Sequence, residues 1–247
     1  MKRKKIIRAG RLCLAAVYTV PQVNDRPHVR AAKTRCSTAA RQRMNLKRAA
    51  RKLELLIAAN FVPGDLFITL TYDDAHLPAD RQTALKRLRK FLRQLKETRK
   101  KRGHGTPYIY VTEGLHGDAR VHHHLILSAA GNDLEELQSL WPCGMIELDW
   151  LGAPNDYAAL AEYLTKEPRE GLRGNNERCW TSSLGLARPI EETSQVDDDL
   201  TLTAPPGAIV LETDGMRNEW GEFSYMKYLL PETLRTLRDR SRKRKRK

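Results

Sequence analysis

The segment PYIYVTEGLHGDARVHHHLIL, residues 107–127, decides the predicted fold. Its two ends, 107–113 and 120–127, are rich in β-branched and aromatic residues. A polar connection that contains Gly114 and Gly117 separates them. This pattern is typical of two strands joined in a hairpin, and such strands run antiparallel. The sequence therefore predicts an antiparallel sheet at the centre of the protein.

The residues around this hairpin predict the rest of the domain. A buried strand is expected at 66–72 (LFITLTY), a leucine-striped helix at 80–101 and a short helix at 132–140. A strand at 145–150 and a helix at 154–166 follow. The order β-α-β-β-α-β-α over residues 65–167 indicates an α+β fold, with helices packed on a central antiparallel sheet.

The two ends of the chain carry weaker patterns. A helix is predicted at 38–60, where the apolar positions form one stripe, and residues 1–36 are expected to be basic and irregular. Residues 191–206 are predicted to be a linker or surface loop, 208–212 and 223–229 an accessory hairpin, and 235–247 a disordered basic tail or frayed helix end. We therefore divide the chain into 1–62 (basic extension and helix), 63–190 (central domain) and 191–247 (accessory hairpin and tail).

Charge is the clearest compositional signal. The chain of 247 residues has 44 Lys and Arg against 30 Asp and Glu, a formal charge of +14. Clustered positive charge indicates a nucleic-acid partner. The basic faces of the helices at 38–60 and 80–101 fit two interpretations equally, a solvated surface or a phosphate-binding face.

Several other classes of protein do not fit the sequence. It has no apolar run of about 18 residues, so no membrane span is expected. The apolar stretch near the N-terminus is interrupted by Arg8 and Arg11, which argues against a signal peptide. The four cysteines form no CxxC pair, so neither a zinc ribbon nor a disulfide framework is indicated. We expect a cytoplasmic protein with reduced thiols.

The strand at 120–127 contains three consecutive histidines. Side chains alternate along a strand, so His122 and His124 are expected on one face and His123 on the other. Two imidazoles at this spacing can bind one metal ion. Glu113, at the end of the neighbouring strand, can complete a set of two histidines and one carboxylate, which suits Mg²⁺ or Mn²⁺.

The helix at 154–166 contains two tyrosines with different predicted roles. Tyr157 belongs to the apolar stripe and is expected to pack in the core. Tyr163 lies about 120° around the helix from that stripe, so its hydroxyl is free to reach a site at the flank. A phenol is a weak nucleophile at neutral pH, but a nearby cation or metal favours attack on phosphate. Lys166, one turn after Tyr163, can supply that charge or hold a DNA backbone.

Three segments, LFITLTY, RVHHHLIL and EYLTKE, occur in the order found in the HUH endonuclease superfamily. More closely, the chain resembles the rolling-circle replication initiators, or Rep proteins, of small single-stranded DNA phages, plasmids and phage-derived bacterial elements. The resemblance covers roughly residues 63–168, and Trp180 with the segment TSSLGLARP is a less specific continuation.

The resemblance implies a ferredoxin-like or RRM-like sheet, a divalent metal on His122 and His124 with Glu113 as third ligand, and Tyr163 as nucleophile. Attack by Tyr163 would leave a 5′-phosphotyrosyl link and a free 3′-hydroxyl. Two features depart from the family pattern. His123 stands where a hydrophobic residue is usual, which leaves open a register with His123 as ligand. Tyr157 and Tyr163 are six residues apart, which does not support a mechanism with two tyrosines.

The sequence therefore predicts a metal-dependent endonuclease that nicks and joins single-stranded DNA. The expected partners are an origin or hairpin in single-stranded DNA and the host replication machinery, including a host helicase, because the chain has no GxxxxGK[ST] loop. A transposase, a mobilisation relaxase and a non-catalytic regulator are the alternatives. The residues expected to contact DNA are Arg48, Arg87, Lys90, Arg120 and Trp180.

Overall fold

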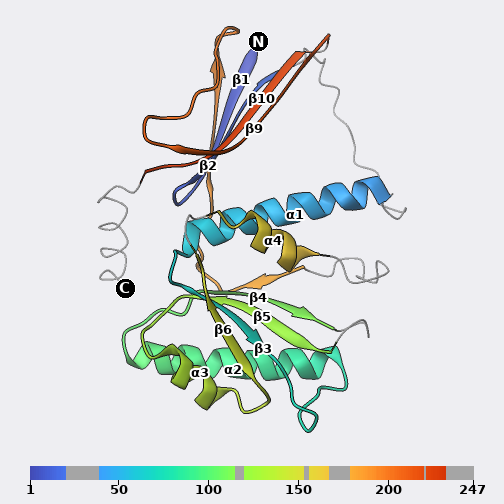
Figure 1. The fold of residues 1–247 in the computed structure, drawn as a ribbon, viewed down its shortest axis with the longest axis vertical. Helices are drawn as coiled ribbons and strands as arrows, with labels where there is room; N and C mark the ends of the chain where they lie inside the picture. Colours follow the sequence, from blue (N-terminus) through green and yellow to red (C-terminus); the bar gives the residue numbers. More distant parts are fainter. Residues whose placement is uncertain (21–38, 115–119, 153–155, 167–178, 220, 232–247) are drawn as a thin grey trace. The chain divides into compact units, whose positions relative to one another are not determined.

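The computed structural model describes residues 1–20, 39–114, 120–152, 156–166, 179–219 and 221–231. The chain folds as two compact units, one from Met1–Cys36 with Arg188–Lys247 and the other from Ser37–Ala187. Each unit contains an antiparallel sheet of five strands, as Figure 1 shows. The predicted class, α+β with helices packed on an antiparallel sheet, is confirmed.

The unit Ser37–Ala187 contains the predicted central sheet. Its strand order is β6-β3-β5-β4-β7. The strands are β3 (Leu66–Leu70), β4 (Tyr108–Glu113), β5 (His122–Leu127), β6 (Ile146–Trp150) and β7 (Thr181–Ser182). The predicted pairing of β4 with β5 is confirmed, with Glu113 opposite His122. The short strand β7, which pairs with β4 at the sheet edge, was not expected from the sequence.

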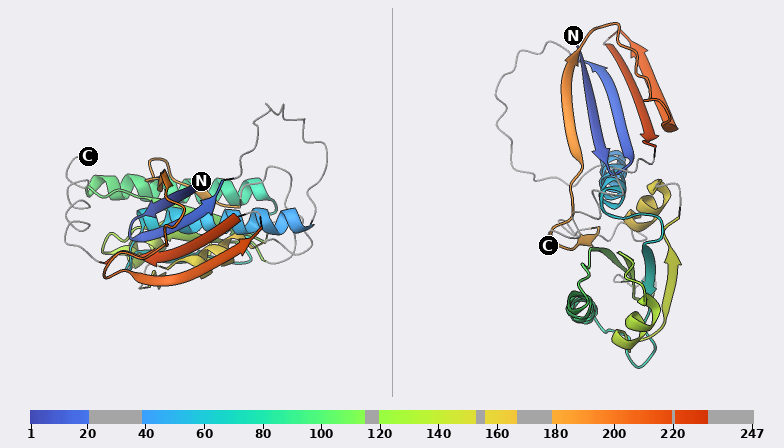
Figure 2. Two further views of the ribbon diagram at one scale, coloured as in Figure 1. Left: turned by 90° about the horizontal axis from the view of Figure 1, so that it is seen from above. Right: turned by 90° about the vertical axis from the view of Figure 1, so that its left-hand side faces the viewer.

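Helices cover both faces of this sheet (Figures 1 and 2). One face carries α2 (Arg81–Lys101) and α3 (Asp133–Leu140), and the other carries α1 (Ala39–Asn60) and α4 (Ala158–Thr165), which contact each other. The apolar stripe of α2 packs with alternate residues of β3 and β5, such as Ile68 and Leu125. The remaining residues of β5, among them His122 and His124, therefore face α1 and α4.

Local signals determine where these elements begin. The side chain of Asp80 accepts a hydrogen bond from the backbone N–H of Thr83 and caps α2, and three cations in the last turn complement the helix dipole. The turn before β6 requires glycine, because a Cβ at Gly144 would lie 2.4 Å from the carbonyl oxygen of Thr71. This close approach fixes β6 beside β3.

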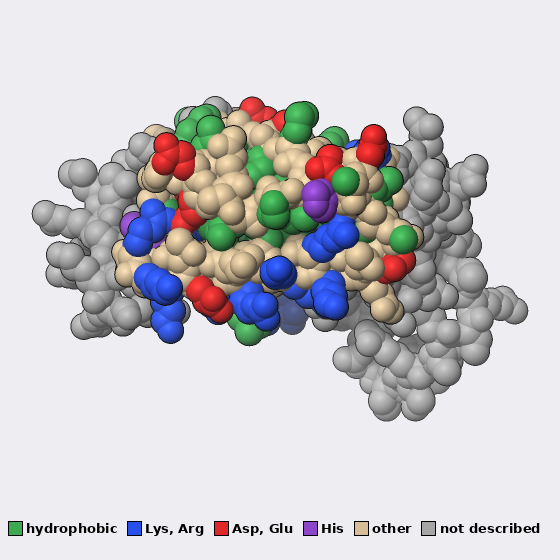
Figure 3. Space-filling model, turned by 90° about the horizontal axis from the view of Figure 1, so that it is seen from below, with side chains coloured by type: hydrophobic (Ala, Val, Ile, Leu, Met, Phe, Trp, Pro, Cys, Tyr) green, Lys and Arg blue, Asp and Glu red, His purple; other side chains and the backbone are tan. Residues whose placement is uncertain are grey.

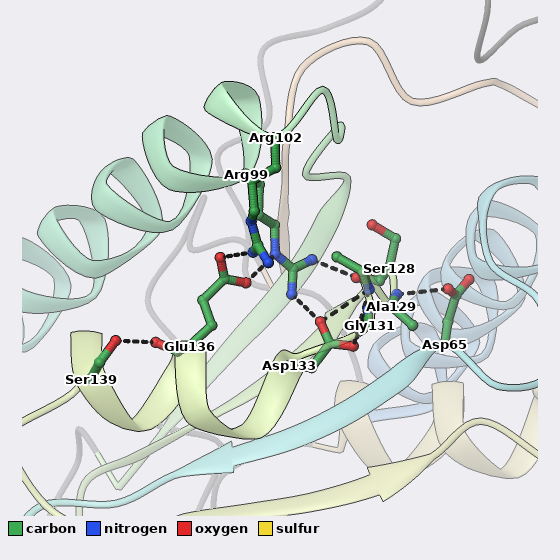
Figure 4. A network of polar contacts seen from close by, with 10 residues as sticks. Asp65, Arg99, Arg102, Ser128, Ala129, Gly131, Asp133, Glu136 and Ser139 are labelled. Atoms are coloured by element: carbon green, nitrogen blue, oxygen red, sulfur yellow. Dashed lines mark hydrogen bonds and ion pairs between the residues drawn. The ribbon is translucent and has the colours of Figure 1, made fainter.

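A buried arginine holds α2, α3 and the end of β5 together (Figure 4). The guanidinium of Arg99 is fully buried and donates to Asp133 at 2.5 Å, to Glu136 at 2.8 Å and to the carbonyl oxygen of Ser128 at 2.6 Å. Arg102, at the surface, also pairs with Glu136. Two charge-assisted hydrogen bonds inside the protein are strong and directional, so this network determines how α3 sits on α2.

The second unit is a sheet with the strand order β8-β1-β2-β10-β9. The strands are β1 (Lys2–Ala9), β2 (Leu12–Thr19), β8 (Ile190–Val196), β9 (Ile209–Asn218) and β10 (Gly221–Leu229). The predicted hairpin near the C-terminus exists as β9 and β10, but it is longer than expected and joins this larger sheet.

Two expectations for the chain ends were wrong. Residues 1–36 are not irregular throughout, because Lys2–Ala9 and Leu12–Thr19 are paired strands. The segment 191–206 is not only a linker, since β8 pairs with β1 along its length. The apolar alternation that marks a strand is weak in both β1 and β8, and an ion pair of 2.7 Å between Lys5 and Glu191 joins them. Their pairing partners are distant in sequence, so no local pattern indicates them.

The predicted basic tail at 235–247 lies outside the described residues. Within the described ranges, none of the helices combines the length and the apolar character needed to cross a bilayer.

Candidate metal and tyrosine site

The two histidines of β5 form the centre of the site. The rings of His122 and His124 lie on the same face of the sheet, with centroids 4.8 Å apart. The predicted alternation along this strand is confirmed. His123 points to the opposite face, where its Nε2 is 2.7 Å from the Tyr72 hydroxyl and its Nδ1 is 2.8 Å from the Thr112 hydroxyl. Burial lowers the pKa of His123 to about 3, so it is a neutral core residue and not part of the metal group.

Glu113 joins the histidine pair from β4. Its carboxylate oxygens lie 3.5 Å from Nε2 of His122 and 3.8 Å from Nε2 of His124. One ligand atom from each of the three residues lies within 4.8 Å of the others. Atoms that bind one ion at about 2.1 Å are roughly 3 Å apart, so a small inward movement would close this set on a metal. Two imidazoles and a carboxylate fit a divalent cation.

Hydrogen bonds to the far ring nitrogens orient both imidazoles. Nδ1 of His122 donates to the carbonyl oxygen of Arg120 at 2.8 Å, and Nδ1 of His124 is 3.2 Å from the hydroxyl of Thr69 on β3. Phe67 stacks on the His124 ring with centroids 5.5 Å apart. These contacts leave Nε2 of each histidine directed into the site, as in protein metal centres.

Thr69 and Phe67 were not predicted as site residues. The signal in the sequence was Thr69, a polar residue between apolar neighbours in the strand LFITL. Its alternation with Ile68 places it on the face away from the α2 core.

Replacing Thr69 by Val is expected to weaken metal binding by about tenfold to 100-fold, because the valine keeps the shape but loses the hydrogen bond that orients His124. Calorimetric titration with Mn²⁺ checks this. Thr193→Val in the other sheet, on β8, is the matched control and should leave the affinity unchanged. Equal affinities for wild type and Thr69→Val would show that Thr69 does not orient a ligand.

The charges in the site are coupled. Burial disfavours the charged form of Glu113, but contacts with His122 and Lys166 outweigh it and hold the pKa of Glu113 well below its usual range. The same carboxylate raises the pKa of His122. Burial lowers the pKa of His124, so that histidine is neutral at neutral pH. The site therefore offers a carboxylate and a neutral imidazole, both in the form that binds metal.

Tyr163 on α4 reaches this group from above the sheet. Its hydroxyl lies 3.0 Å from Nε2 of His124, and the side chain is 43% exposed. Nζ of Lys166, just after α4, lies 3.0 Å from Glu113 and 4.2 Å from the centre of the Tyr163 ring. A solvent-accessible hydroxyl, a carboxylate, two imidazoles and an ammonium group therefore meet at one point. Tyr157 is 3% exposed, as predicted for a core residue.

The residues predicted to contact DNA do not all gather here. Arg120 lines a pocket of about 430 Å³ beside the histidines and Tyr163. Arg48 is exposed on α1, which lies on the same face of the sheet, and Trp180 is half-buried just before β7. Arg87 and Lys90 are on α2, across the sheet, where Lys and Arg side chains gather along the surface (Figure 3). Their contact with DNA stays a prediction.

The geometry defines a candidate metal site with a tyrosine beside it. Residues 65–168, which run from β3 to the residues after α4, match the model of a family described as replication-associated protein, of the ORF2 type. This match indicates a Rep-like protein and a link to replication. Comparison with curated proteins and with solved structures gives no match.

Proposed function

We propose that the chain is a metal-dependent endonuclease that nicks and rejoins single-stranded DNA and so initiates rolling-circle replication. The observation that carries this proposal is the distance of 3.0 Å between the Tyr163 hydroxyl and His124, within the group that also contains His122 and Glu113. The family match over residues 65–168 supports the link to replication.

In the proposed reaction the Tyr163 oxygen attacks a phosphodiester. The new bond joins that oxygen to phosphorus, and the bond from phosphorus to the 3′-oxygen of the preceding nucleotide breaks. The tyrosine loses its proton and the 3′-oxygen gains one, so the products are a 5′-phosphotyrosyl link and a free 3′-hydroxyl. The ester bond is conserved, and the reverse reaction can rejoin the strand without an energy source.

Each residue of the group has a separate task in this reaction. His122, His124 and Glu113 would hold Mg²⁺ or Mn²⁺, which when bound polarises the phosphate as a Lewis acid. Lys166 places a positive charge beside both Tyr163 and Glu113, where the phosphate must enter. Arg120 is 49% exposed at the edge of the pocket and is suited to contact a neighbouring phosphate. We propose a host helicase as the partner that separates the strands.

Incubation with a random library of single-stranded oligonucleotides and Mn²⁺ tests the proposal. We expect a protein–DNA adduct that survives denaturant, contains one recurrent sequence and does not form when EDTA removes the metal. Sequencing the trapped DNA identifies the substrate. A recurrent hairpin from the ends of a mobile element would favour a transposase, and DNA binding with no adduct under any metal would identify a non-catalytic regulator.

A further inference from the structure

The pocket beside Tyr163 has an acidic wall that the metal group does not use. In the sheet, Thr69 pairs with His124 on one side and with Glu147 on the other, and Phe67 pairs with Asp149. Residues directly opposite each other on neighbouring strands point to the same face. Glu147 and Asp149 of β6 therefore lie on the same face as His124, and both line the pocket of about 430 Å³.

Charge is distributed unevenly along this pocket. Arg120 lies at one end, next to His122, and the two carboxylates lie along the β6 side. In the part of the chain that the structure describes, Glu147 and Asp149 have no hydrogen-bond or ion-pair partner among the side chains. Two unpaired carboxylates repel a phosphodiester backbone. A DNA strand whose phosphate is at Tyr163 must therefore run its backbone along the cations and turn a base toward β6.

The pocket also offers a surface on which a base can stack. Phe67 lies between the carboxylates and the histidines, is half-buried and already stacks on His124. Unpaired bases in single strands stack on aromatic side chains while polar groups contact their Watson–Crick edges. A ring beneath and hydrogen-bond acceptors at the side are the two elements that base recognition requires.

We propose that Glu147 and Asp149 read the base of a nucleotide next to the scissile phosphate, an inference that rests on the proposed nicking function. Carboxylates only accept hydrogen bonds, so they favour a base edge that donates. Guanine presents two adjacent N–H donors, N1 and N2, to a carboxylate. Thymine presents one N–H between two carbonyl oxygens, which the carboxylates repel. The pocket therefore selects guanine and disfavours thymine at this position.

The adduct library tests this with a double variant, Glu147→Gln with Asp149→Asn. Amides both donate and accept, so the variant should still form the adduct but lose the base preference. We expect wild type to favour guanine over thymine about tenfold or more at one of the two nucleotides that flank the cut, and the variant to show a ratio near one. The control is Glu97→Gln with Glu135→Gln, which removes the same charge from exposed positions on α2 and α3 and should keep the preference.

The possible results separate this inference from the proposed function. An adduct whose flanking bases are random in wild type, or equally biased in wild type and the double variant, overturns the base-reading role and leaves the nicking function intact. A double variant that loses the adduct for every sequence and also takes up less Mn²⁺ overturns it too, because the carboxylates would then serve the metal. Failure of wild type to form any adduct contradicts the proposed function itself.

Discussion

Replacing Tyr163 by Phe is expected to abolish both cleavage and the covalent adduct, lowering the cleavage rate on the order of 10³-fold or more. The phenylalanine keeps the ring that packs 5.2 Å from His124 and under Lys166 and removes only the hydroxyl that would attack phosphorus. Binding of Mn²⁺ and of the oligonucleotide should persist. Single-turnover cleavage of the recovered oligonucleotide, with a denaturing gel for the adduct, measures the effect.

Tyr157→Phe is the matched control, because Tyr157 immediately precedes the same helix and is buried. It should cleave at close to the wild-type rate. If Tyr163→Phe cleaved normally and Tyr157→Phe did not, the nucleophile would be assigned to the wrong tyrosine. If both variants retained the adduct, the mechanism through a tyrosine on α4 would be wrong.

Replacing Arg99 by Met is expected to lower the free energy of unfolding by about 3–5 kcal/mol, the typical cost of leaving buried charges without their partner. Asp133 and Glu136 are 4% and 8% exposed, and the methionine would fill most of the space of the arginine without pairing with either. In a protein of this size such a loss lowers the melting temperature by roughly 6–20 °C. Thermal and urea denaturation of the full chain measure it.

Arg102→Met provides the comparison, because that side chain is 40% exposed although it pairs with the same Glu136. A surface ion pair contributes about 0–1 kcal/mol, so this variant should unfold close to wild type. A triple variant, Arg99→Met with Asp133→Asn and Glu136→Gln, should recover part of the stability, since no unpaired charge remains buried. Equal stability of Arg99→Met and wild type would show that the network does not hold α3 in place.

The central domain was predictable because its signals are local. Alternation along residues 120–127 was enough to separate His122 and His124 from His123, and helical spacing separated Tyr163 from Tyr157. The site then follows from one step of sheet geometry, the pairing of Glu113 with His122. Order of elements and periodicity therefore predicted both the sheet and the residues that meet on it.

What the sequence did not indicate depends on partners that are distant in the chain. Strand β1 begins with four consecutive cations, Lys2 to Lys5, and its strand character appears only when β8 pairs with it. Thr69 has no distinguishing neighbour in the sequence, and its role depends on a histidine on another strand. Glu147 and Asp149 look like the ordinary polar face of a strand until the pocket beside them is known.

The connectivity of the second sheet has a consequence for biosynthesis. Its central strand β2 lies between β1 from the start of the chain and β10 from near its end, and the whole of Ser37–Ala187 is inserted between them. On the ribosome, the first hairpin must wait for most of the chain to be translated before its neighbours exist, whereas the inserted unit can fold as soon as it emerges. A nascent chain that stalls after residue 187 would therefore carry a complete set of site residues and an unfinished sheet with unpaired strand edges.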